Sequence, residues 1–272
     1  MTDSTHDVGP STHDAGPGRL EEGDLVLLLD SKGRRYLVNL QSGKEFHSHS
    51  GVITHDEIIG SAEGSSMRST HGGSYTVLRA TMADFILKMP RGAQVIYPKD
   101  IAPLLVMADI APGVRVFESG VGSGALSMAM LRCGAEIVGY ELREDFANRA
   151  RSNVERFLGS DALGRYDVTI RDSYEGIDEE GLDRVVLDLP EPWRVVPHAT
   201  GALRPGGIIA GYSPSITQVI RFREALEAAG CFSLVETIEV LHRGWYIDGA
   251  AVRPDHRMVA HTGFLTSSRR LA

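Results

Sequence analysis

The sequence of 272 residues contains little cysteine, no long apolar run and no excess of basic residues, and each shortage excludes a class of protein. The two cysteines, Cys133 and Cys231, are too few for a disulfide framework, so we expect them as buried small side chains in a reducing cytosol. No apolar stretch approaches the ~20 residues that cross a bilayer. Because the first residues are polar, we expect no secretory signal, no membrane association and a cytoplasmic protein.

The charge balance is acidic, with a formal net charge of −8. This weakens a prediction of general nucleic-acid binding, since proteins that bind polyanions usually carry a basic excess. It leaves room for a local basic patch. Hydrophobic residues make up 42% of the chain, which is enough for a sizeable core, and the length predicts one large domain or two smaller ones.

Three regions differ in composition. Residues 1–19 are predicted to be a disordered tail, because a tandem heptad at 4–17 has low hydrophobicity and two Gly-Pro breaks. Residues 20–80 are rich in short β-type runs and turns, which predicts a small N-terminal β domain. Its strands are expected at 24–30, 35–40, 51–53 and 75–78. Residues 81–272, beginning with a short helix at 81–88, are predicted to form the main domain.

Strand and helix patterns alternate through most of this main domain. Strands are expected at 114–118, 135–141, 167–172, 182–188 and 208–212, helices at 101–110, 143–158, 193–203 and 216–230, and closing strands at 234–241 and 261–267. This alternation predicts an α/β fold with a mostly parallel sheet.

The chain is organised around a glycine-rich turn between a strand and a helix. Gly120, Gly122 and Gly124 follow an apolar run that ends in Glu118, and a helical pattern begins at Ala125. Such glycines allow a sharp turn and let a ligand lie against the main chain. The turn therefore predicts a nucleoside-containing cofactor. It does not decide which one, since a loose dinucleotide pattern G-x-G-x-x-A also fits.

Acidic residues end four of the expected strands: Glu118, Glu141, Asp172 and Asp188. Glu141 stands where a carboxylate accepts hydrogen bonds from two ribose hydroxyls. Asp172 either accepts from an adenine amine or pins the adjoining loop. An NAD enzyme needs neither Asp172 nor the Asp-Leu-Pro step at 188–190, and together they indicate a methyltransferase that uses S-adenosylmethionine. A helix cap or a solvated loop residue is the plainer interpretation of each acid taken singly.

These motifs resemble the tRNA adenine-N1 methyltransferases that modify adenosine-58 in the T loop, in their bacterial and archaeal form. The resemblance covers roughly residues 22–270 and is carried by segments 94–100, 118–124, 188–193, and 253–258 with 261–265. It implies a Rossmann-like class I methyltransferase domain after a small N-terminal β domain. It also implies S-adenosyl-L-methionine as cofactor, tRNA as substrate and a homotetramer.

Matching positions imply the site residues. The cofactor pocket would be lined by Gln94, Val121, Gly122, Ser123, Gly124, Glu141, Phe146, Asp172, Ser173 and Asp188. Tyr97 and Tyr212 would flank the target base, although packing is an equally good interpretation of either tyrosine. No metal site is predicted. The chain departs from the family at Ser119 and Val121 in the loop and in a shortened link at 132–135.

Asp188 is the residue that we expect to carry the chemistry. Adenine N1 attacks through a lone pair and needs no strong base, but the methylated ring is cationic. A carboxylate beside N1 and the exocyclic amine would orient the base, stabilise the charge and later assist proton loss. Capping of the following turn is the alternative role. The target lies within the folded T loop and would have to be extruded to react.

Arginine and lysine concentrate in two places that could form a basic groove across subunits. These are Lys32, Arg34 and Arg35 near the N-terminus and Arg243, Arg253, Arg257, Arg269 and Arg270 near the C-terminus. A solvated charged face is the alternative. Other functions stay open: a methyltransferase of the same fold acting on a small molecule or protein, an NAD-dependent oxidoreductase, and a non-catalytic RNA-binding subunit. Whether adenosine-57 is also a target is not determined by the sequence.

Overall fold

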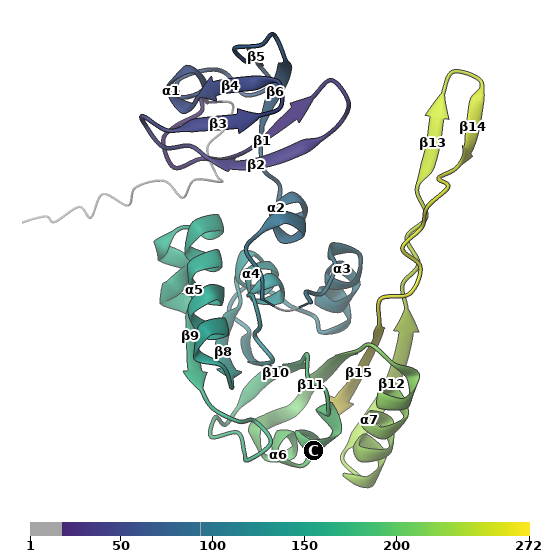
Figure 1. The fold of residues 1–272 in the computed structure, drawn as a ribbon. Coiled ribbons are helices and arrows are strands. Elements are labelled where there is room, and N and C mark those ends of the chain that lie inside the picture. The colour runs from purple at the N-terminus through teal and green to yellow at the C-terminus, as the bar shows by residue number, and fades with distance from the viewer. Residues whose placement is uncertain (1–17, 93) are drawn as a thin grey trace, which may run out of the picture. The chain divides into compact units, whose positions relative to one another are not determined.

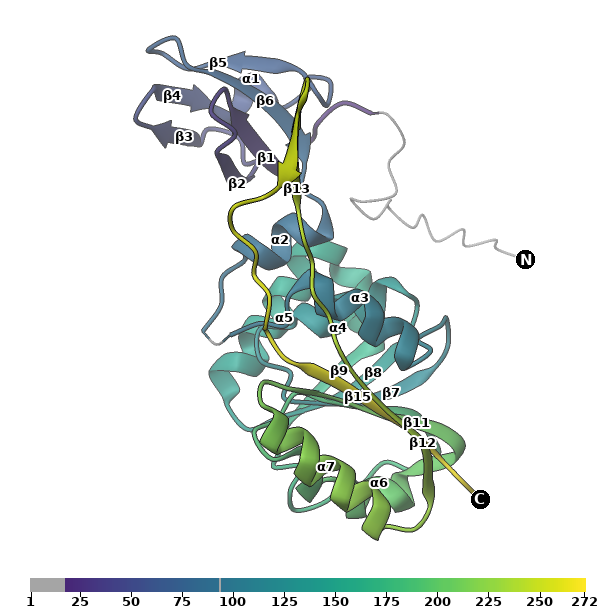
Figure 2. The same ribbon diagram turned by 90° about the vertical axis from the view of Figure 1, so that its right-hand side faces the viewer.

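The structure is a computed structural model that describes residues 18–92 and 94–272. The tail predicted at 1–19 therefore lies outside the described residues except for its last two, of which Arg19 forms an isolated β-bridge with Ala62. The chain forms two compact units (Figures 1 and 2). The first runs to Met89 and includes Phe157–Gly159, and the second contains Pro90–Arg156 and Ser160–Ala272. The predicted domain boundaries stay a prediction.

The first unit is built on a four-stranded antiparallel sheet in the order β2-β1-β6-β5. Its elements are β1 (Leu25–Asp30), β2 (Arg35–Asn39), β3 (Glu45–Ser48), β4 (Gly51–Thr54), α1 (His55–Ile58), β5 (Ser66–Arg68), β6 (Ser74–Arg79) and α2 (Met82–Lys88). Alternation along β6 buries Tyr75 and Val77 against Val26 and Leu28 of β1. The short strands β3 and β5 were not predicted, because their residues alternate too weakly to indicate a strand.

Two reciprocal caps fix where the helices of this unit begin. The Thr54 side chain accepts from the Glu57 N–H while the Glu57 carboxylate accepts from the Thr54 N–H, which starts α1. Thr81 and Asp84 repeat the arrangement at α2. The Asp84 carboxylate also forms an ion pair with the guanidinium of Arg35 on β2, at an N–O distance of 3.3 Å. Helix α2 is therefore joined to the first unit, although the sequence assigned it to the main domain.

The second unit contains a seven-stranded sheet in the order β12-β15-β11-β10-β7-β8-β9. Its strands are β7 (Arg115–Ser119), β8 (Glu136–Glu141), β9 (Tyr166–Ile170), β10 (Leu182–Leu187), β11 (Leu203–Ser213), β12 (Phe232–Glu239) and β15 (Phe264–Arg270). The strands from β11 to β9 are parallel, whereas β15 runs antiparallel to both β11 and β12. The predicted mostly parallel sheet is confirmed.

Helices cover both faces of this sheet. They are α3 (Pro98–Met107), α4 (Ala125–Arg132), α5 (Glu144–Leu158), α6 (Val196–Ala202) and α7 (Ile216–Ala228), with short 3-10 turns at Ser160–Arg165 and Pro192–Arg194. Helices α3, α4 and α5 lie on one face and α6 and α7 on the other (Figures 1 and 2). Helix α5 buries Ala147, Ala150 and Val154, while Phe146 is only half-buried.

A hairpin of β13 (Trp245–Asp248) and β14 (Ala251–Pro254) interrupts the path from β12 to β15. It stands away from the seven-stranded sheet (Figures 1 and 2), and we call residues 241–259 the arm. Trp245, Ile247 and Val252 are exposed on it. The sequence did not predict this hairpin. Among the described helices none is long and apolar enough to cross a membrane.

Candidate active site

The sheet topology creates a crevice beside the central strands. From β7 the chain continues through α4 to β8 on one side, while β10 leads to β11 on the other. Ligands bind at the carboxyl ends of strands where the order reverses in this way. A cavity of about 660 Å³ lies at this point, a size typical of ligand pockets. It lies wholly within the second unit and is lined by side chains that follow β7, β8, β9, β10 and β11.

The three glycines of the turn have different structural reasons. All have positive φ, at 84° for Gly120, 58° for Gly122 and 81° for Gly124. A Cβ on Gly120 would overlap the carbonyl oxygen of Asp188, and one on Gly124 would press on Ala150 at 3.1 Å. A Cβ on Gly122 would meet only the Gly120 carbonyl oxygen, at an ordinary 3.8 Å, and Gly122 lines the cavity. The turn therefore closes tightly against β10 and α5 and leaves bare main chain at Gly122 for a ligand.

The carboxylate of Glu141 is held at the rim of this turn. One oxygen accepts the Gly122 N–H at 3.0 Å and the other accepts the Arg143 N–H at 3.0 Å. The residue is 7% exposed and lines the cavity. Each oxygen keeps a further lone pair, so the carboxylate can accept from the two hydroxyls of a ribose.

Asp172 and Ser173 line the next part of the cavity, after β9. Asp172 accepts the Tyr174 N–H at 2.8 Å, which is the loop-pinning role that the sequence left open for it. The Ser119 hydroxyl donates to the Ser173 hydroxyl at 2.8 Å and joins the ends of two strands. Phe146 also lines the cavity, and the Arg143 guanidinium carbon lies 3.8 Å from its ring centre. Together they provide polar acceptors and an aromatic face for a planar base.

Asp188 follows β10 and faces the same cavity. Its N–H donates to the Ser119 carbonyl at 2.9 Å, which fixes the backbone. Within the described residues its carboxylate has no hydrogen-bond donor. Burial, and then the nearby charge of Glu141, raise the pKa of Asp188 to about 7. The group can therefore gain or lose a proton near neutral pH, as a catalytic acid or base must.

Glu118, the first of the four acids predicted at strand ends, differs from the other three in position. Glu118 is buried beneath the turn and does not line the cavity. The Ser127 hydroxyl donates to it at 2.6 Å, and the Tyr166 hydroxyl donates to Ser127 at 3.0 Å. Burial raises the pKa of Glu118 to about 8, against the Ser127 hydrogen bond and with help from the charges of Asp188 and Glu141. This acid belongs to the core because it lies inside β7.

The two tyrosines predicted to flank the target base differ in position. Tyr212, at the end of β11, lines the cavity, but it is only 7% exposed and its hydroxyl donates to the Thr262 carbonyl at 2.6 Å. Tyr97 is the residue before α3 and is not among the lining residues. The structure thus lines the cavity with Tyr212 and not with Tyr97, which lies near Tyr212, and a role for Tyr97 at the target base stays a prediction.

The predicted cofactor residues form two groups. Those that line the cavity are Gln94, Gly122, Glu141, Phe146, Asp172, Ser173 and Asp188. Val121, Ser123 and Gly124 lie behind the turn instead, with Val121 packed beside Gly139 and Gly124 starting α4. The turn reaches the cavity with Gly120 and Gly122, because its positive φ angles direct the neighbouring side chains inward.

Sequence reasoning missed several lining residues, some beside predicted ones and others from distant segments. Examples are Arg171, Tyr174, Pro214, Gln218 and Thr262. The pattern Ser215-x-x-Gln218 could have been recognised as a helix cap, and Gln218 also donates to the Pro190 carbonyl at 2.9 Å. Thr262 carried no local signal, since only the return of the chain into β15 brings it to the cavity.

The residues present fit a nucleoside cofactor. The bare main chain at Gly122, the two oxygens of Glu141 and the Phe146 ring suit a sugar and a base. Behind the turn, the buried Ser123 hydroxyl has no hydrogen-bond partner among the described residues, and it does not line the cavity. In the described parts of the chain no group of three or more His, Cys, Asp or Glu side chains could hold a metal ion.

Two family models match the chain. The one described as tRNA methyltransferase complex GCD14 subunit matches residues 73–251, and the one described as TrmI-like N-terminal matches residues 18–67. Together they account for most of both compact units.

Named relatives are similar over nearly the whole chain. A Thermus thermophilus protein, tRNA (adenine(58)-N(1))-methyltransferase TrmI, is 36% identical over 248 residues, which cover 90% of this chain and 96% of the relative. A Methanocaldococcus jannaschii protein, tRNA (adenine(57)-N(1)/adenine(58)-N(1))-methyltransferase TrmI, is 34% identical, covering 89% of this chain and 94% of the relative.

Solved structures agree with these matches. TrmI from Aquifex aeolicus, described as a tRNA (m1A58) methyltransferase, has a TM-score of 0.81 at 29% identity and covers 93% of this chain and 99% of its own. A Thermotoga maritima protein described as a SAM-dependent O-methyltransferase has a TM-score of 0.88 at 32% identity and covers 94% of this chain and 96% of its own. The chain therefore belongs to the TrmI family of tRNA (adenine-N1)-methyltransferases and has its class I S-adenosylmethionine-dependent methyltransferase fold.

Proposed function

We propose that this enzyme transfers a methyl group from S-adenosyl-L-methionine to N1 of adenosine-58 in the T loop of tRNA. The observation that carries the proposal is Asp188, a carboxylate without a donor in the described chain, at the switch point of the sheet, with its pKa raised to about 7. The named relatives support the choice of acceptor.

The cofactor would be held on the β7–β8–β9 side of the cavity. It supplies a methyl group that its sulfonium already activates. Glu141 would accept from the ribose hydroxyls, and the free oxygen of Asp172 would accept from the adenine amine. Gly122 would allow close approach of the main chain because it has no side chain. Binding and orientation are thus the work of residues that the turn and three strand ends bring together.

Asp188 would act on the target base from the β10 side. A carboxylate beside N1 and the exocyclic amine orients the ring before attack, and it stabilises the positive charge that the ring acquires. Because burial raises the pKa of Asp188 to about 7, its ionised form can also accept a proton from the amine near neutral pH. Tyr212 supports this proposal as a wall of the cavity on the same side, and stacking of Tyr97 on the base stays a prediction.

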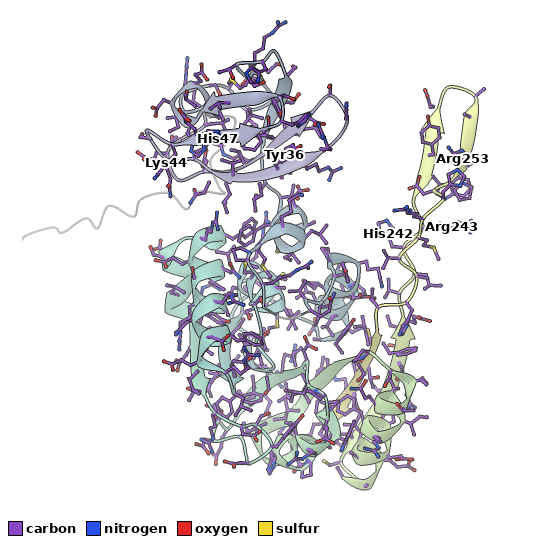
Figure 3. All side chains as sticks on the ribbon, in the orientation of Figure 1. Tyr36, Lys44, His47, His242, Arg243 and Arg253 are labelled. Atoms are coloured by element: carbon purple, nitrogen blue, oxygen red, sulfur yellow. The ribbon has the colours of Figure 1, made fainter. Side chains whose placement is uncertain are left out.

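Several cations of the arm are available for the RNA backbone. Arg243 and Arg253 are exposed on it, and Figure 3 shows them with His242. Arg34 and Arg35 of the first unit instead form ion pairs with Asp30 and Asp84. The proposed basic surface is therefore better supported at the arm than at the N-terminal hairpin.

The experiment is methylation of an unmodified tRNA transcript with labelled cofactor, followed by mapping of the modified nucleoside. We expect 1-methyladenosine at position 58 and none in a transcript with guanosine there. Asp188→Ala should keep cofactor affinity by calorimetry and lose turnover by about 10²-fold or more, the usual scale for a positioned acid or base. Unchanged turnover in that variant would reject the assignment of Asp188.

The same map separates the alternatives. The Methanocaldococcus relative is named for adenine 57 as well as 58, so a second modified position would extend the proposal. A product methylated on oxygen would instead agree with the description of the Thermotoga chain. A chain that binds tRNA without turnover would be a non-catalytic subunit.

We also propose a cytoplasmic homotetramer. The exposed Trp245, Ile247 and Val252 of the arm support association, because apolar side chains grouped on one element are usually covered by a partner. Light scattering coupled to gel filtration would give the mass, and a monomer at micromolar concentration would contradict the proposal.

A further inference from the structure

A buried ion pair at the start of α3 has no part in the site described so far. Asp100 is fully buried, and one of its carboxylate oxygens accepts from the Lys99 ammonium at 2.7 Å. Its other oxygen accepts from the Thr262 hydroxyl at 2.6 Å. The Lys99 side chain is only 9% exposed, and its ammonium also donates to the Val240 carbonyl at 2.7 Å. All these residues belong to the second unit.

These contacts hold both ends of the arm. Val240 is where the chain leaves β12, and Thr262 is where it returns to enter β15. Lys99 of α3 binds the outgoing segment through the Val240 carbonyl, and Asp100 of α3 binds the returning segment through the Thr262 hydroxyl. The base of the arm is therefore attached to α3 by one ion pair.

The same contacts reach the cavity. Thr262 lines it, and the Thr262 carbonyl accepts the Tyr212 hydroxyl at 2.6 Å. Neighbouring Gly263 packs so closely against the Tyr212 ring that a Cβ there would meet it at about 2.5 Å. Asp100 does not itself line the cavity. It acts through Thr262, which in turn fixes Tyr212.

His261 attaches this segment from the other side. Its Nδ1 lies 2.7 Å from a Glu239 carboxylate oxygen and its Nε2 lies 3.0 Å from the Pro214 carbonyl. Both partners accept only, so the ring satisfies both when it carries two protons, and these two contacts raise the pKa of His261. Pro214 also lines the cavity.

Stability alone does not account for a charge pair at this place. Desolvation offsets much of the attraction between buried ions, and well-packed apolar side chains of similar size often replace such a pair without loss. The pair instead fixes geometry, because each carboxylate oxygen of Asp100 accepts from one defined side chain, Lys99 or Thr262. This favours a role in positioning the cavity wall.

We propose that Asp100, with Lys99, is a positioning residue for methyl transfer that fixes the Thr262–Tyr212 wall and links it to the arm. The inference rests on the proposed function. The wall adjoins β10 and β11, beside Asp188, whereas Glu141 and Asp172 lie across the sheet at β8 and β9. Loss of the pair should therefore impair the step that involves the target base and spare cofactor affinity.

The decisive variant is the double substitution Lys99→Met with Asp100→Leu, which replaces the pair with apolar side chains of similar size and lets the protein fold. We expect kcat/KM for tRNA to fall about tenfold or more while the cofactor Kd stays within about twofold. Asp100→Asn should recover most of the activity, because its amide oxygen can accept from Lys99 and its amide group can donate to the Thr262 hydroxyl.

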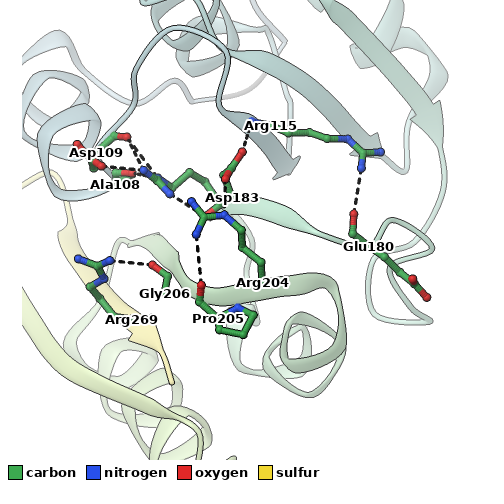
Figure 4. Close-up of polar contacts among 10 residues, drawn as sticks. Ala108, Asp109, Arg115, Glu180, Asp183, Arg204, Pro205, Gly206 and Arg269 are labelled. Atoms are coloured by element: carbon green, nitrogen blue, oxygen red, sulfur yellow. Dashed lines mark hydrogen bonds and ion pairs between the residues drawn. The ribbon is translucent and has the colours of Figure 1, made fainter. Parts of the chain in front are cut away.

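The matched control is the ion pair between Arg184 and Asp109, a residue that follows the carboxyl end of α3. Arg184 is buried near the amino end of β10, opposite the end that leads to the cavity, and its guanidinium pairs at 2.8 Å with Asp109. Figure 4 labels Asp109 among its neighbours. Asp109→Asn keeps a residue that tolerates the local φ of 49°. It should lower the unfolding temperature without changing kcat/KM.

A second readout does not depend on turnover. Hydrogen exchange measured by mass spectrometry should show faster exchange at 240–241 and 261–263 in the double variant and unchanged exchange in β7 and β8. Equal exchange and equal kcat/KM in wild type and double variant would overturn the inference. The two proposals can fail separately. If the wild-type protein does not methylate adenosine-58 but the double variant still shows faster exchange, the proposed function is rejected and the structural link between α3 and the arm is kept.

Discussion

Asp188 makes a measurable prediction about stability, separate from turnover. Burial, and secondly the charge of Glu141, raise the pKa of Asp188 from an ordinary 3.8 to about 7. Between these values the folded protein holds a proton that the unfolded chain releases. The free energy of unfolding therefore falls as pH rises from about 4 to about 7. Asp188→Asn removes this titration and should gain stability relative to wild type over the same range.

The size of the gain follows from the pKa difference. A difference of roughly 3 pKa units corresponds to about 4 kcal/mol at 1.36 kcal/mol per unit. This is an upper limit, since relaxation and water entry around the cavity reduce the cost of the charge. For a domain of this size 1 kcal/mol moves the unfolding temperature by about 2–4 °C, so the rise at pH 8 should be on the order of 5–10 °C.

The assay is thermal unfolding of wild type and Asp188→Asn from pH 4.5 to pH 8. We expect nearly equal midpoints at the acidic end and a difference that grows to its full size above pH 7. A variant that is no more stable than wild type at pH 8, or that is equally stabilised at every pH, would refute the reasoning.

Asp183 supplies a control of opposite sign. Burial would raise its pKa, but hydrogen bonds from the Arg115 N–H at 2.8 Å and from Arg204 at 2.6 Å outweigh this and lower it (Figure 4). Its charge therefore stabilises the fold above its ordinary pKa. Asp183→Asn should lose stability at pH 7, and the loss should shrink as pH falls below about 4.

Two further predictions concern the turn and the arm. Gly120→Ala should abolish cofactor binding measured by calorimetry, because φ is 84° and a Cβ would overlap the Asp188 carbonyl. The control variant Gly164→Ala has open space around the new methyl group and should bind the cofactor normally. Equal binding by the two variants would contradict the close packing at Gly120. Affinity for tRNA should fall as salt rises, and Arg243→Ala with Arg253→Ala should reduce the slope of log K against log salt by up to about 2, one for each arginine that no longer neutralises a phosphate. An unchanged slope would place the RNA elsewhere.

Local sequence was sufficient for the centre of the fold. The β-branched run before Gly120, the three alternating glycines and the helical pattern from Ala125 each indicate one element, and in combination they allow one arrangement. The acids at strand ends could be assigned to one edge because parallel strands align their carboxyl ends. Glu141, Asp172 and Asp188 followed from that rule and line the cavity.

The strand-end rule failed where the burial of a side chain decided whether it lines the cavity. Glu118 ends the same apolar run, but one more residue of strand buries it against Ser127. Tyr97 did not come from this rule: the resemblance implied it, it precedes α3 outside the cavity lining, and its role stays a prediction. Position along a strand predicts an edge of the sheet, and it does not predict how far a side chain stands from that edge.

The sequence by itself determined the strand–turn–helix unit, the parallel order that follows from it and the family, because these depend on short patterns whose physical reason is local. Only the tertiary structure decided that β15 returns antiparallel beside β11, which brings Thr262 to Asp100 across 162 positions of the chain. Only the fold also decided the pKa of Asp188, since that value comes from burial and from Glu141, which is remote in sequence. Contacts between distant segments, and the loss of water around them, leave no pattern in the neighbouring residues.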